Sequence, residues 1–240
     1  VDPIGFGGDC LRRLEESVVG YLRRAREAAA EVGARVLLTG ILPSLGKADL
    51  GMHNISEKPR YYALNEALGR LRGNRPYQLS IKGIDELILE HDNVMLEACN
   101  TSFQAHFQVD PGTFARHYNT AQAVAGAVLA ACANSPLLFG RRLWRETRIA
   151  LFQQSVDTRA PSSLMRESVG RVSFGNHWVE DSVLDIFRED IARFKTLFSD
   201  IEEEESIAIL ESGELPKLRA LCLHNGTVYR WMRACYGSTG

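Results

Sequence analysis

The chain has 240 residues, of which 45% are hydrophobic and 24% are charged. These proportions are typical of a water-soluble globular chain with one large domain or two small ones, and they exclude a disordered, collagenous or coiled-coil protein. With 28 basic and 30 acidic side chains, the net charge is −2. No overall positive field therefore attracts a phosphate backbone or an anionic lipid surface. We expect no nucleic-acid partner and no membrane partner.

The longest apolar stretch, residues 121–133, is dominated by alanine and is shorter than the ~20 residues that a membrane span requires. It predicts a buried helix. The five cysteines form no CxxC pair, and their odd number prevents complete pairing within one chain. This usage favours a reducing compartment, the cytoplasm. The sequence has no zinc-ribbon spacing, Walker loop, GxSxG elbow, HExxH or GxGxxG motif, so general motifs assign no chemistry.

The first part of the chain combines helical and extended patterns. Residues 9–32 carry apolar side chains at spacings of three and four, which predicts a helix capped by Asp9. The apolar run at residues 35–42 predicts a buried strand. Residues 44–55 are rich in Gly, Ser, Asp and Asn and predict a surface loop. The sequence after this loop resembles the entry of a helix over residues 61–71.

A polar and apolar alternation follows in the middle of the chain. Residues 80–89 fit either a helix or a strand, whereas residues 100–109 alternate strictly and predict a strand with one polar face. Gln104 and His106 are two residues apart and would project from that face. The face is either a solvated surface of the sheet or a floor that presents polar groups to a substrate or metal. Spacing alone leaves both interpretations open.

The next elements are mainly helical. Residues 111–133 predict a helix whose second part, 121–133, is deeply buried. The chain turns at residues 134–136, and residues 143–152 predict another helix with charged side chains. Residues 158–175 have no clear period and predict a long loop, a kind of segment that often forms lids or binding sites.

The last part of the chain predicts two helices and a hairpin. Residues 179–198 have helical spacing, and the acidic residues 202–205 begin a short helix whose N-terminal dipole they favour. The segments 218–223 and 227–231 predict a hairpin, with Asn225 and the following glycine at its turn. Helices outnumber strands, so the pattern indicates an α+β fold with a sheet that holds helices mainly on one face.

Several longer stretches occur in a particular order, and among them the ANSP turn followed by WxETRxxLFQQxxDxR is long and specific. Together they resemble the glutamate–cysteine ligase family, in its bacterial carboxylate–amine ligase branch related to glutamine synthetase. The stretches are GILPSL at 40–45, KPRYYALNE at 58–66, ACNTSFQAHFQV at 98–109, ANSPLLFGRRLWRETRIALFQQSVDTR at 133–159 and LHNGTVYRWMRACYG at 223–237.

The resemblance implies one glutamine synthetase-like catalytic domain over residues 1–240, with a mainly antiparallel sheet covered by helices on one face. It implies a cytoplasmic bacterial ligase of glutathione biosynthesis that acts on small molecules and uses ATP and Mg²⁺. Such a ligase phosphorylates the γ-carboxylate of glutamate, and an amine then displaces phosphate to form an amide. Cysteine is the amine that the family name suggests. Hard cations that neutralise the triphosphate require carboxylate oxygens and an occasional imidazole.

The resemblance also implies roles for polar residues of the central strand and the hairpin. His106 matches the family's histidine beside the metal and the nucleotide phosphates, and Gln104 is its neighbour on that face. Tyr229 and Arg230 match candidates for contact with the nucleotide. A structural role for His106, as a hydrogen-bonded core histidine, stays an alternative.

Three further residues are implied as substrate-binding groups. Arg148, in WRETR, matches an arginine that meets the substrate carboxylate or the transferred phosphoryl group, where a planar bidentate cation suits the geometry. It is the catalytic candidate, and a surface salt bridge is the alternative. Arg159 is a second substrate-binding candidate. Asn134 is a third, although its simpler role is to fix the ANSP turn.

The sequence departs from the family pattern in two places. A strand of the type G-x-E-x-E with a following metal-binding acid, and a strand resembling H-L-R-x-E-N-R, do not occur in it, and Met232 and Ala234 replace an expected Asn and Pro. We therefore expect a fragment of a longer chain, incomplete at both ends and poorly active alone. A non-catalytic regulatory relative that binds nucleotide or amino acid stays open. So does a structural module whose residues 121–133 pack against another subunit in a homo-oligomer.

Overall fold

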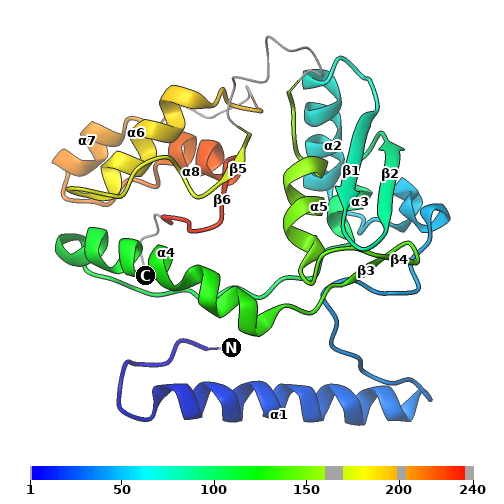
Figure 1. The fold of residues 1–240 in the computed structure, drawn as a ribbon. Helices are drawn as coiled ribbons and strands as arrows, with labels where there is room; N and C mark the ends of the chain where they lie inside the picture. The colour runs from blue at the N-terminus through cyan, green and yellow to red at the C-terminus, as the bar shows by residue number, and fades with distance from the viewer. Residues whose placement is uncertain (1, 160–169, 199–203, 236–240) are drawn as a thin grey trace. The chain divides into compact units, whose positions relative to one another are not determined.

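The computed structural model describes residues 2–159, 170–198 and 204–235 (Figure 1). The chain divides into two compact units, residues 1–39 and residues 40–240. Helices and short strands are both present, which confirms the α+β class. In the described residues the strands form three separate two-stranded ladders, and no extended antiparallel sheet is among them. The assignment of residues 1–240 to one domain stays a prediction. Within the described residues, no helix has the length and apolar character needed to cross a membrane.

The first unit consists mainly of helix α1, Cys10–Glu31, which confirms the helix predicted at residues 9–32. Asp9 occupies the N-cap position, but its side chain accepts no capping hydrogen bond. It lies instead 3.8 Å from the guanidinium of Arg12.

The strand predicted at residues 35–42 is wrong, because the structure has no regular element there. Leu37 and Leu38 are 72% and 64% exposed. An apolar run forms a buried strand only when a partner strand satisfies its backbone groups, and no described strand pairs with this segment.

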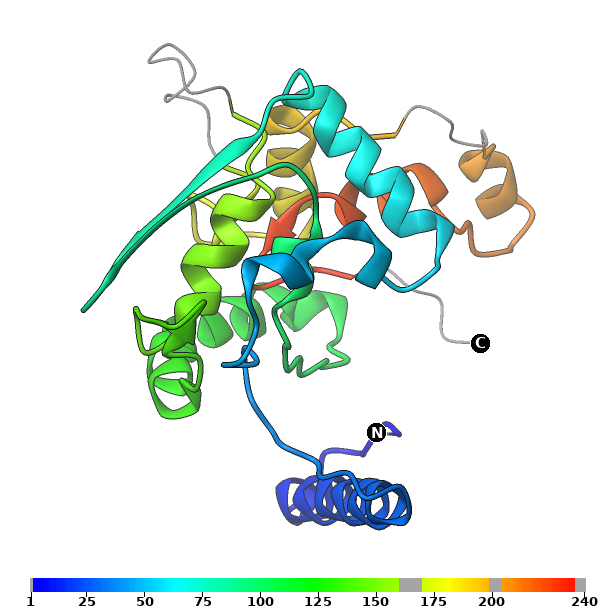
Figure 2. The same cartoon turned by 90° about the vertical axis from the view of Figure 1, so that its right-hand side faces the viewer.

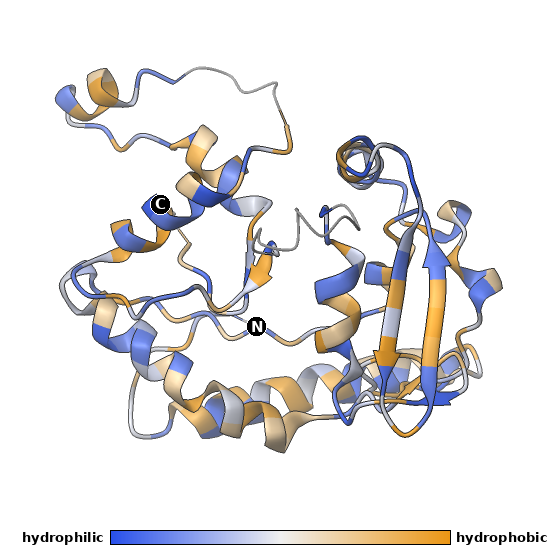
Figure 3. Ribbon diagram, turned by 45° about the horizontal axis from the view of Figure 1, so that its top comes forward, coloured by the Kyte–Doolittle hydropathy of each residue, from blue (hydrophilic) through white to orange (hydrophobic). Residues whose placement is uncertain are grey.

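The first core of the second unit is built on a hairpin. Strands β1, Tyr77–Lys82, and β2, Glu86–His91, pair antiparallel with Leu79 opposite Leu89, and each buries alternate side chains. Figure 3 shows the hydrophobic stretch in the middle of β2. The segment left ambiguous at residues 80–89 is therefore this hairpin. Its core also contains residues of neighbouring helices and turns. The buried members are Ile41, Leu50, Leu79, Ile81, Leu87, Leu89, Met95, Leu96, Leu138, Leu143, Ala150 and Leu151.

Helix α5, Thr147–Ser155, packs against β1 (Figure 1 and Figure 2). Its Gln154 side chain accepts from Ser80 N at 2.8 Å and donates to Ser80 O at 3.0 Å. The amide of Gln154 thus replaces one residue of a partner strand at the edge of β1. The helix predicted at residues 143–152 is confirmed in type, but it begins four residues later.

The other elements around the first core are helical. Helix α2, Pro59–Leu71, begins with proline at its first position, which confirms the predicted helix entry. Helix α3, Met95–Ala98, follows β2. The predicted loop at residues 44–55 contains two 3₁₀ turns, Lys47–Leu50 and Met52–Asn54, and Leu50 is buried.

The strand predicted at residues 100–109 is wrong. The structure shows irregular backbone there, with Phe103 and Phe107 79% and 64% exposed. An alternation of polar and apolar residues specifies a strand only where the side chains of one face pack into a core. Because both sets lie at the surface here, the polar face expected to carry Gln104 and His106 is absent from the described structure.

The helix predicted at residues 111–133 is confirmed, but the deep burial of its second part is wrong. A 3₁₀ turn, Pro111–Thr113, leads into helix α4, Phe114–Cys132. Tyr118 is the buried residue of α4, and its hydroxyl donates to Met232 O at 2.9 Å. Residues 121–133 are partly or fully exposed. Alanine permits a helix to be buried without requiring it, since its side chain gains little from leaving water.

The hairpin β3, Leu137–Leu138, and β4, Arg141–Arg142, follows the predicted turn at 134–136. Its two turn residues, Phe139 and Gly140, have φ of 48° and 73°, the left-handed pair that tight hairpins require.

The second core lies between α4, helix α6, Val183–Arg193, and helix α8, Arg219–Gly226. Ser182 caps α6 in a capping box with Asp185, while helix α7, Ser206–Glu211, follows further along the chain. The buried members of this core are Tyr118, Val179, Ile186, Phe187 and Ala234.

The hairpin predicted from residues 218–223 and 227–231 is wrong. The first arm is helix α8, and the second contains β6, Tyr229–Arg230, which pairs parallel with β5, Val172–Ser173. The Asn-Gly pair ends a helix here rather than turning a hairpin, since both residues are also common at helix C-termini.

Leu151 in α5 is fully buried in the first core, so truncation should leave a cavity. We expect Leu151→Ala to lower the free energy of unfolding by about 2–5 kcal/mol, measured by chemical denaturation. Leu184→Ala in α6, at a site that is half exposed, is the matched control and should cost less than about 1 kcal/mol. Equal losses for the two variants would contradict the core described here.

Candidate functional site

Arg148, the second residue of α5, forms a bidentate ion pair with Glu146. Its Nε donates to Oε1 of Glu146 at 2.6 Å and its Nη2 to Oε2 at 2.5 Å. Its Nη1 donates to the carbonyl of Thr101 at 2.7 Å. Glu146 stands at the N-cap position of α5, so the pair joins the turn before the helix to its first turn. The guanidinium is thereby fixed on two sides.

The carboxylate of Glu146 also accepts a hydrogen bond from Ser135. The hydroxyl of Ser135 donates to Oε1 of Glu146, and Thr147 N donates to Ser135 O at 3.2 Å. Ser135 and Glu146 are both buried. Burial alone would raise the pKa of the Glu146 carboxyl, but the hydrogen bonds from Arg148 and Ser135 outweigh it and hold this pKa below its usual range. Glu146 is therefore ionised at neutral pH.

Gly40 lies directly against the guanidinium. A Cβ at this position would be 2.6 Å from Oδ1 of Asn134 and 2.9 Å from Cζ of Arg148. The carbonyl of Gly40 accepts from both N and Oγ1 of Thr101 at 2.9 Å. Only a residue without a side chain permits this approach of backbone to guanidinium.

Four sequence stretches that are distant along the chain thus meet at one place. We call this group the Arg148 cluster. Its members are Gly40, Thr101, Asn134, Ser135, Glu146 and Arg148. Of these, sequence reasoning identified Arg148 and Asn134 as site candidates and missed the other four. In the sequence, these four residues were indicated only by their position within the stretches 40–45, 98–109 and 133–159, which resemble the family.

The guanidinium in this cluster still has donors to offer. An arginine side chain carries five N–H groups, and the bonds to Glu146 and Thr101 described here use three of them. One proton on each terminal nitrogen is left, and the side chain is 22% exposed. The pair is not a helical surface bridge, because Glu146 precedes Arg148 by two residues and its side chain is buried. This arrangement can bind a carboxylate or phosphoryl oxygen.

Asn100, which precedes Thr101, carries a second unusual feature. Both polar atoms of its side chain are buried and have no hydrogen-bond partner within the described part of the chain. Buried amides without partners are rare in folded proteins and require an explanation such as water or a ligand.

Gln104 and His106 are exposed residues of the irregular segment after Thr101. The structure therefore does not present them on a sheet floor. Across residues 2–159, 170–198 and 204–235, no three His, Cys, Asp or Glu side chains gather as metal ligands. The assignment of His106 to a metal and of both residues to the nucleotide stays a prediction.

Arg159 pairs with Asp157, with its Nε 2.9 Å from both carboxylate oxygens. Its Nη2 lies 3.5 Å from the place where a Cβ of Gly170 would be. Part of the loop predicted at residues 158–175 lies outside the described residues, and its described end contains β5. Contact of Arg159 with substrate stays a prediction.

Arg230 belongs to a buried ion-pair network in the second unit. Its Nε lies 2.9 Å and 3.0 Å from the carboxylate oxygens of Asp190, and its Nη2 donates to Glu189 at 2.7 Å. Although burial opposes its charge, these acids raise the pKa of Arg230 further above its usual range. The neighbouring Tyr229 packs its ring edge-on against Phe152, at 5.4 Å between centroids. These contacts of Arg230 with Asp190 and Glu189 are those of an ion pair in a protein core.

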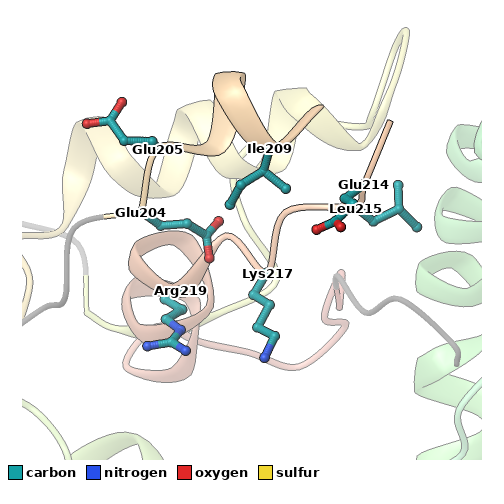
Figure 4. A pocket seen from close by; sticks show the side chains of 7 residues that line it. All are labelled: Glu204, Glu205, Ile209, Glu214, Leu215, Lys217 and Arg219. Carbon is teal, nitrogen blue, oxygen red and sulfur yellow. The ribbon is translucent and has the colours of Figure 1, made fainter. Parts of the chain in front are cut away.

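A cavity of about 390 Å³ lies between α7 and the chain before α8 (Figure 4). None of the predicted site residues lines it. Glu204, on its wall, accepts from Leu218 N and Ser206 Oγ at 2.9 Å each, so this carboxylate holds the chain between α7 and α8. The lining residues are Glu204, Glu205, Ile209, Glu214, Leu215, Lys217 and Arg219.

The chain matches the model of a known protein family. The family model described as glutamate-cysteine ligase family 2 (GCS2) matches residues 5–219, which is most of the chain. No curated protein and no solved structure matches. The matched range contains every member of the Arg148 cluster, and it ends before Tyr229 and Arg230.

Gly40→Ala tests the close approach in the Arg148 cluster. Because the added Cβ would overlap Asn134 and Arg148, we expect the free energy of unfolding to fall by about 1–3 kcal/mol, measured by chemical denaturation. Gly126→Ala in α4 is the control, since nothing lies within 4 Å of its added Cβ; it should be neutral or stabilising by up to about 1 kcal/mol. A Gly40→Ala variant as stable as the unmodified chain would contradict this packing.

The Arg230 network predicts a pH dependence of stability. Burial would raise the pKa of Glu189, but the hydrogen bond and charge of Arg230 prevail and lower it below the ordinary value of 4.5. A carboxyl whose pKa is lower in the folded state stabilises the protein above its unfolded pKa. That stability is lost as the pH falls from the ordinary value through the folded pKa.

We expect Glu189→Gln to lower stability at pH 7 by about 1–2 kcal/mol and to reduce the further loss below pH ~4.5. Denaturation curves measured from pH 7 to pH 3 give both quantities. The exposed Glu180 provides the control Glu180→Gln, which should follow the unmodified chain. A Glu189→Gln curve parallel to that of the unmodified chain would rule out this carboxyl as a source of acid sensitivity.

Proposed function

Because the chain belongs to glutamate-cysteine ligase family 2, a family of ligase-type enzymes, we propose that it takes part in an ATP- and Mg²⁺-dependent carboxylate–amine ligation. The substrates are glutamate, activated at its γ-carboxylate, and an amine such as cysteine. The proposal includes a glutamine synthetase-like catalytic domain and a cytoplasmic location. It also assigns Arg159 and Asn134 to the substrate and Gln104, His106, Tyr229 and Arg230 to the nucleotide, with His106 as a ligand of the metal as well.

The observation that carries this proposal is the Arg148 cluster. A guanidinium that is fixed by Glu146 and Thr101 and keeps two N–H donors is suited to an oxygen anion. Its position is set before any ligand arrives, so little reorganisation accompanies the development of charge. The partnerless amide of Asn100 beside Thr101 supplies further hydrogen-bonding capacity for a polar ligand.

The proposed reaction has two steps. In the first, a γ-carboxylate oxygen of glutamate attacks the terminal phosphorus of ATP, and ADP leaves. In the second, the amine nitrogen attacks the acyl carbon, phosphate leaves, and the nitrogen loses a proton. Arg148 would hold the carboxylate or the transferred phosphoryl group in both steps. Among the described residues no three His, Cys, Asp or Glu side chains gather as ligands for the ion, and Mg²⁺ commonly binds through one or two protein ligands together with the substrate phosphates.

The test is ADP release with Mg²⁺, ATP, L-glutamate and a panel of amines including cysteine, on this chain and on the longest product of its gene. We expect amine-dependent release, and a kcat/KM for glutamate about 10- to 100-fold lower in Arg148→Lys, because lysine loses the bidentate geometry and about 1.5–3 kcal/mol.

Arg142→Lys is the matched control for this experiment. Arg142 is also bidentate on an acid, with Nε and Nη2 at 3.2 Å and 3.1 Å from Asp85, but it is largely exposed and lies outside the Arg148 cluster. Its kcat/KM should stay within about twofold of the unmodified value. Binding of ATP or glutamate without turnover in any form would replace the catalytic reading by a regulatory one.

A further inference from the structure

Glu97, the third residue of α3, is a half-buried carboxylate that the proposed reaction does not use. Its side chain has no hydrogen bond or ion pair within the described residues. Burial raises the pKa of the Glu97 carboxyl, and no described cation opposes this effect. Glu146 and Glu189 are also shielded from water, but each is paired with an arginine. Glu97 is therefore an uncompensated acid in the second unit, which is costly unless a cation binds beside it.

Asn100 adds a second unsatisfied side chain to the same turn. Its backbone N donates to Glu97 O at 3.0 Å, so the helical turn continues past the end of α3. Side chains three residues apart on such a turn are neighbours. Both polar atoms of the Asn100 amide are buried and have no partner in the described part of the chain. Its carbonyl oxygen can accept a hydrogen bond from a ligand that also reaches Glu97.

An aromatic ring lies near this pair. Burial raises the pKa of the Tyr229 hydroxyl, and the negative charge of Glu97 raises it further, which requires the two side chains to be close. The ring of Tyr229 is held edge-on by Phe152 of α5. A carboxylate, an amide oxygen and an aromatic ring are groups that attract an ammonium ion, which has three N–H donors and a positive charge.

The Glu97–Asn100 pair adjoins the Arg148 cluster. Asn100 precedes Thr101, whose carbonyl accepts from Nη1 of Arg148 at 2.7 Å. Helix α3 also packs against α5, the helix that carries Arg148. Groups suited to a cation are therefore neighbours of a guanidinium suited to an oxygen anion. Small molecules that carry both an ammonium group and a carboxylate are amino acids.

We propose that Glu97 and Asn100 form the subsite for the ammonium group of an amino acid whose carboxylate is held by Arg148. The ammonium donates to the carboxylate of Glu97 and to the amide oxygen of Asn100. Its charge compensates that of Glu97, and the buried oxygen of Asn100 gains a partner. This inference rests on the proposed function, because it fills the site with an amino-acid substrate of the ligation. The subsite selects substrates by their amino group and takes part in no covalent step.

The test compares amino acids with analogues that lack only the amino group. Glutarate is the analogue of L-glutamate, and 3-mercaptopropionate is that of L-cysteine. Binding of all four to the full chain is measured by isothermal titration calorimetry. We expect at least one amino acid to bind about 10-fold or more tightly than its analogue, since a hydrogen bond to a charged group is worth this much. The pair that shows the preference identifies whether the ammonium belongs to glutamate or to the amine substrate.

Glu97→Gln should remove this preference. Affinity for the amino acid should fall about 10- to 100-fold, whereas affinity for the analogue should not fall. Arg148→Lys should weaken the amino acid and its analogue alike, because both keep the carboxylate. Glu90→Gln is the control, since Glu90 is exposed on β2, and it should keep the preference. Glu97→Gln should unfold at or above the temperature of the unmodified chain, because it removes an uncompensated charge.

Three results would overturn the proposal: no binding of any of the four compounds, equal affinity of the unmodified chain for amino acid and analogue in both pairs, or a parallel loss of both members in Glu97→Gln. The ligase reaction is tested separately by ADP release. An intact preference that depends on Glu97, in a chain that releases no ADP, would support the ammonium subsite and count only against the ligation.

Discussion

The ion pair between Arg148 and Glu146 is the interaction on which the candidate site depends. It is short and bidentate, and its carboxylate is buried. Truncation of one partner would leave the other as an uncompensated charge, which is costly in a folded protein. Ser135 and Thr101 complete the pair from two other parts of the chain. The fold therefore holds this guanidinium more firmly than a surface salt bridge would.

Among the described residues two arginines are buried, Arg230 and Arg171, and their contacts differ from those of the partly exposed Arg148. Arg230 is surrounded by Asp190 and Glu189, and its side chain is almost fully buried. Arg171 donates to Thr227 O at 3.1 Å and Lys195 O at 2.8 Å, just beyond the C-terminal ends of α8 and α6. Negative helix ends stabilise a cation there. Both residues hold the second unit together, whereas Arg148 keeps donors at the surface.

Helices could be predicted from this sequence better than strands. The helices predicted at residues 9–32, 61–71 and 111–133 exist, because the spacing of apolar residues and the residues at helix ends are local signals. The strands predicted at residues 35–42 and 100–109 do not exist in the described structure. A strand depends on a partner that lies elsewhere in the chain, and the local pattern does not report whether that partner is present.

The candidate site was predictable only in part for the same reason. Arg148 was identified by its stretch, but the role of Gly40 follows from a distance to Arg148 that no local pattern contains. The pair with Glu146 also changes what Arg148 can do. Since the positive charge is already balanced, an anionic ligand is held mainly by the direction of the remaining N–H donors. The guanidinium of Arg148 therefore distinguishes between ligands by the positions of their oxygen atoms. Its hydrogen bonds are strongest where new negative charge develops on an oxygen that lies along its remaining N–H directions.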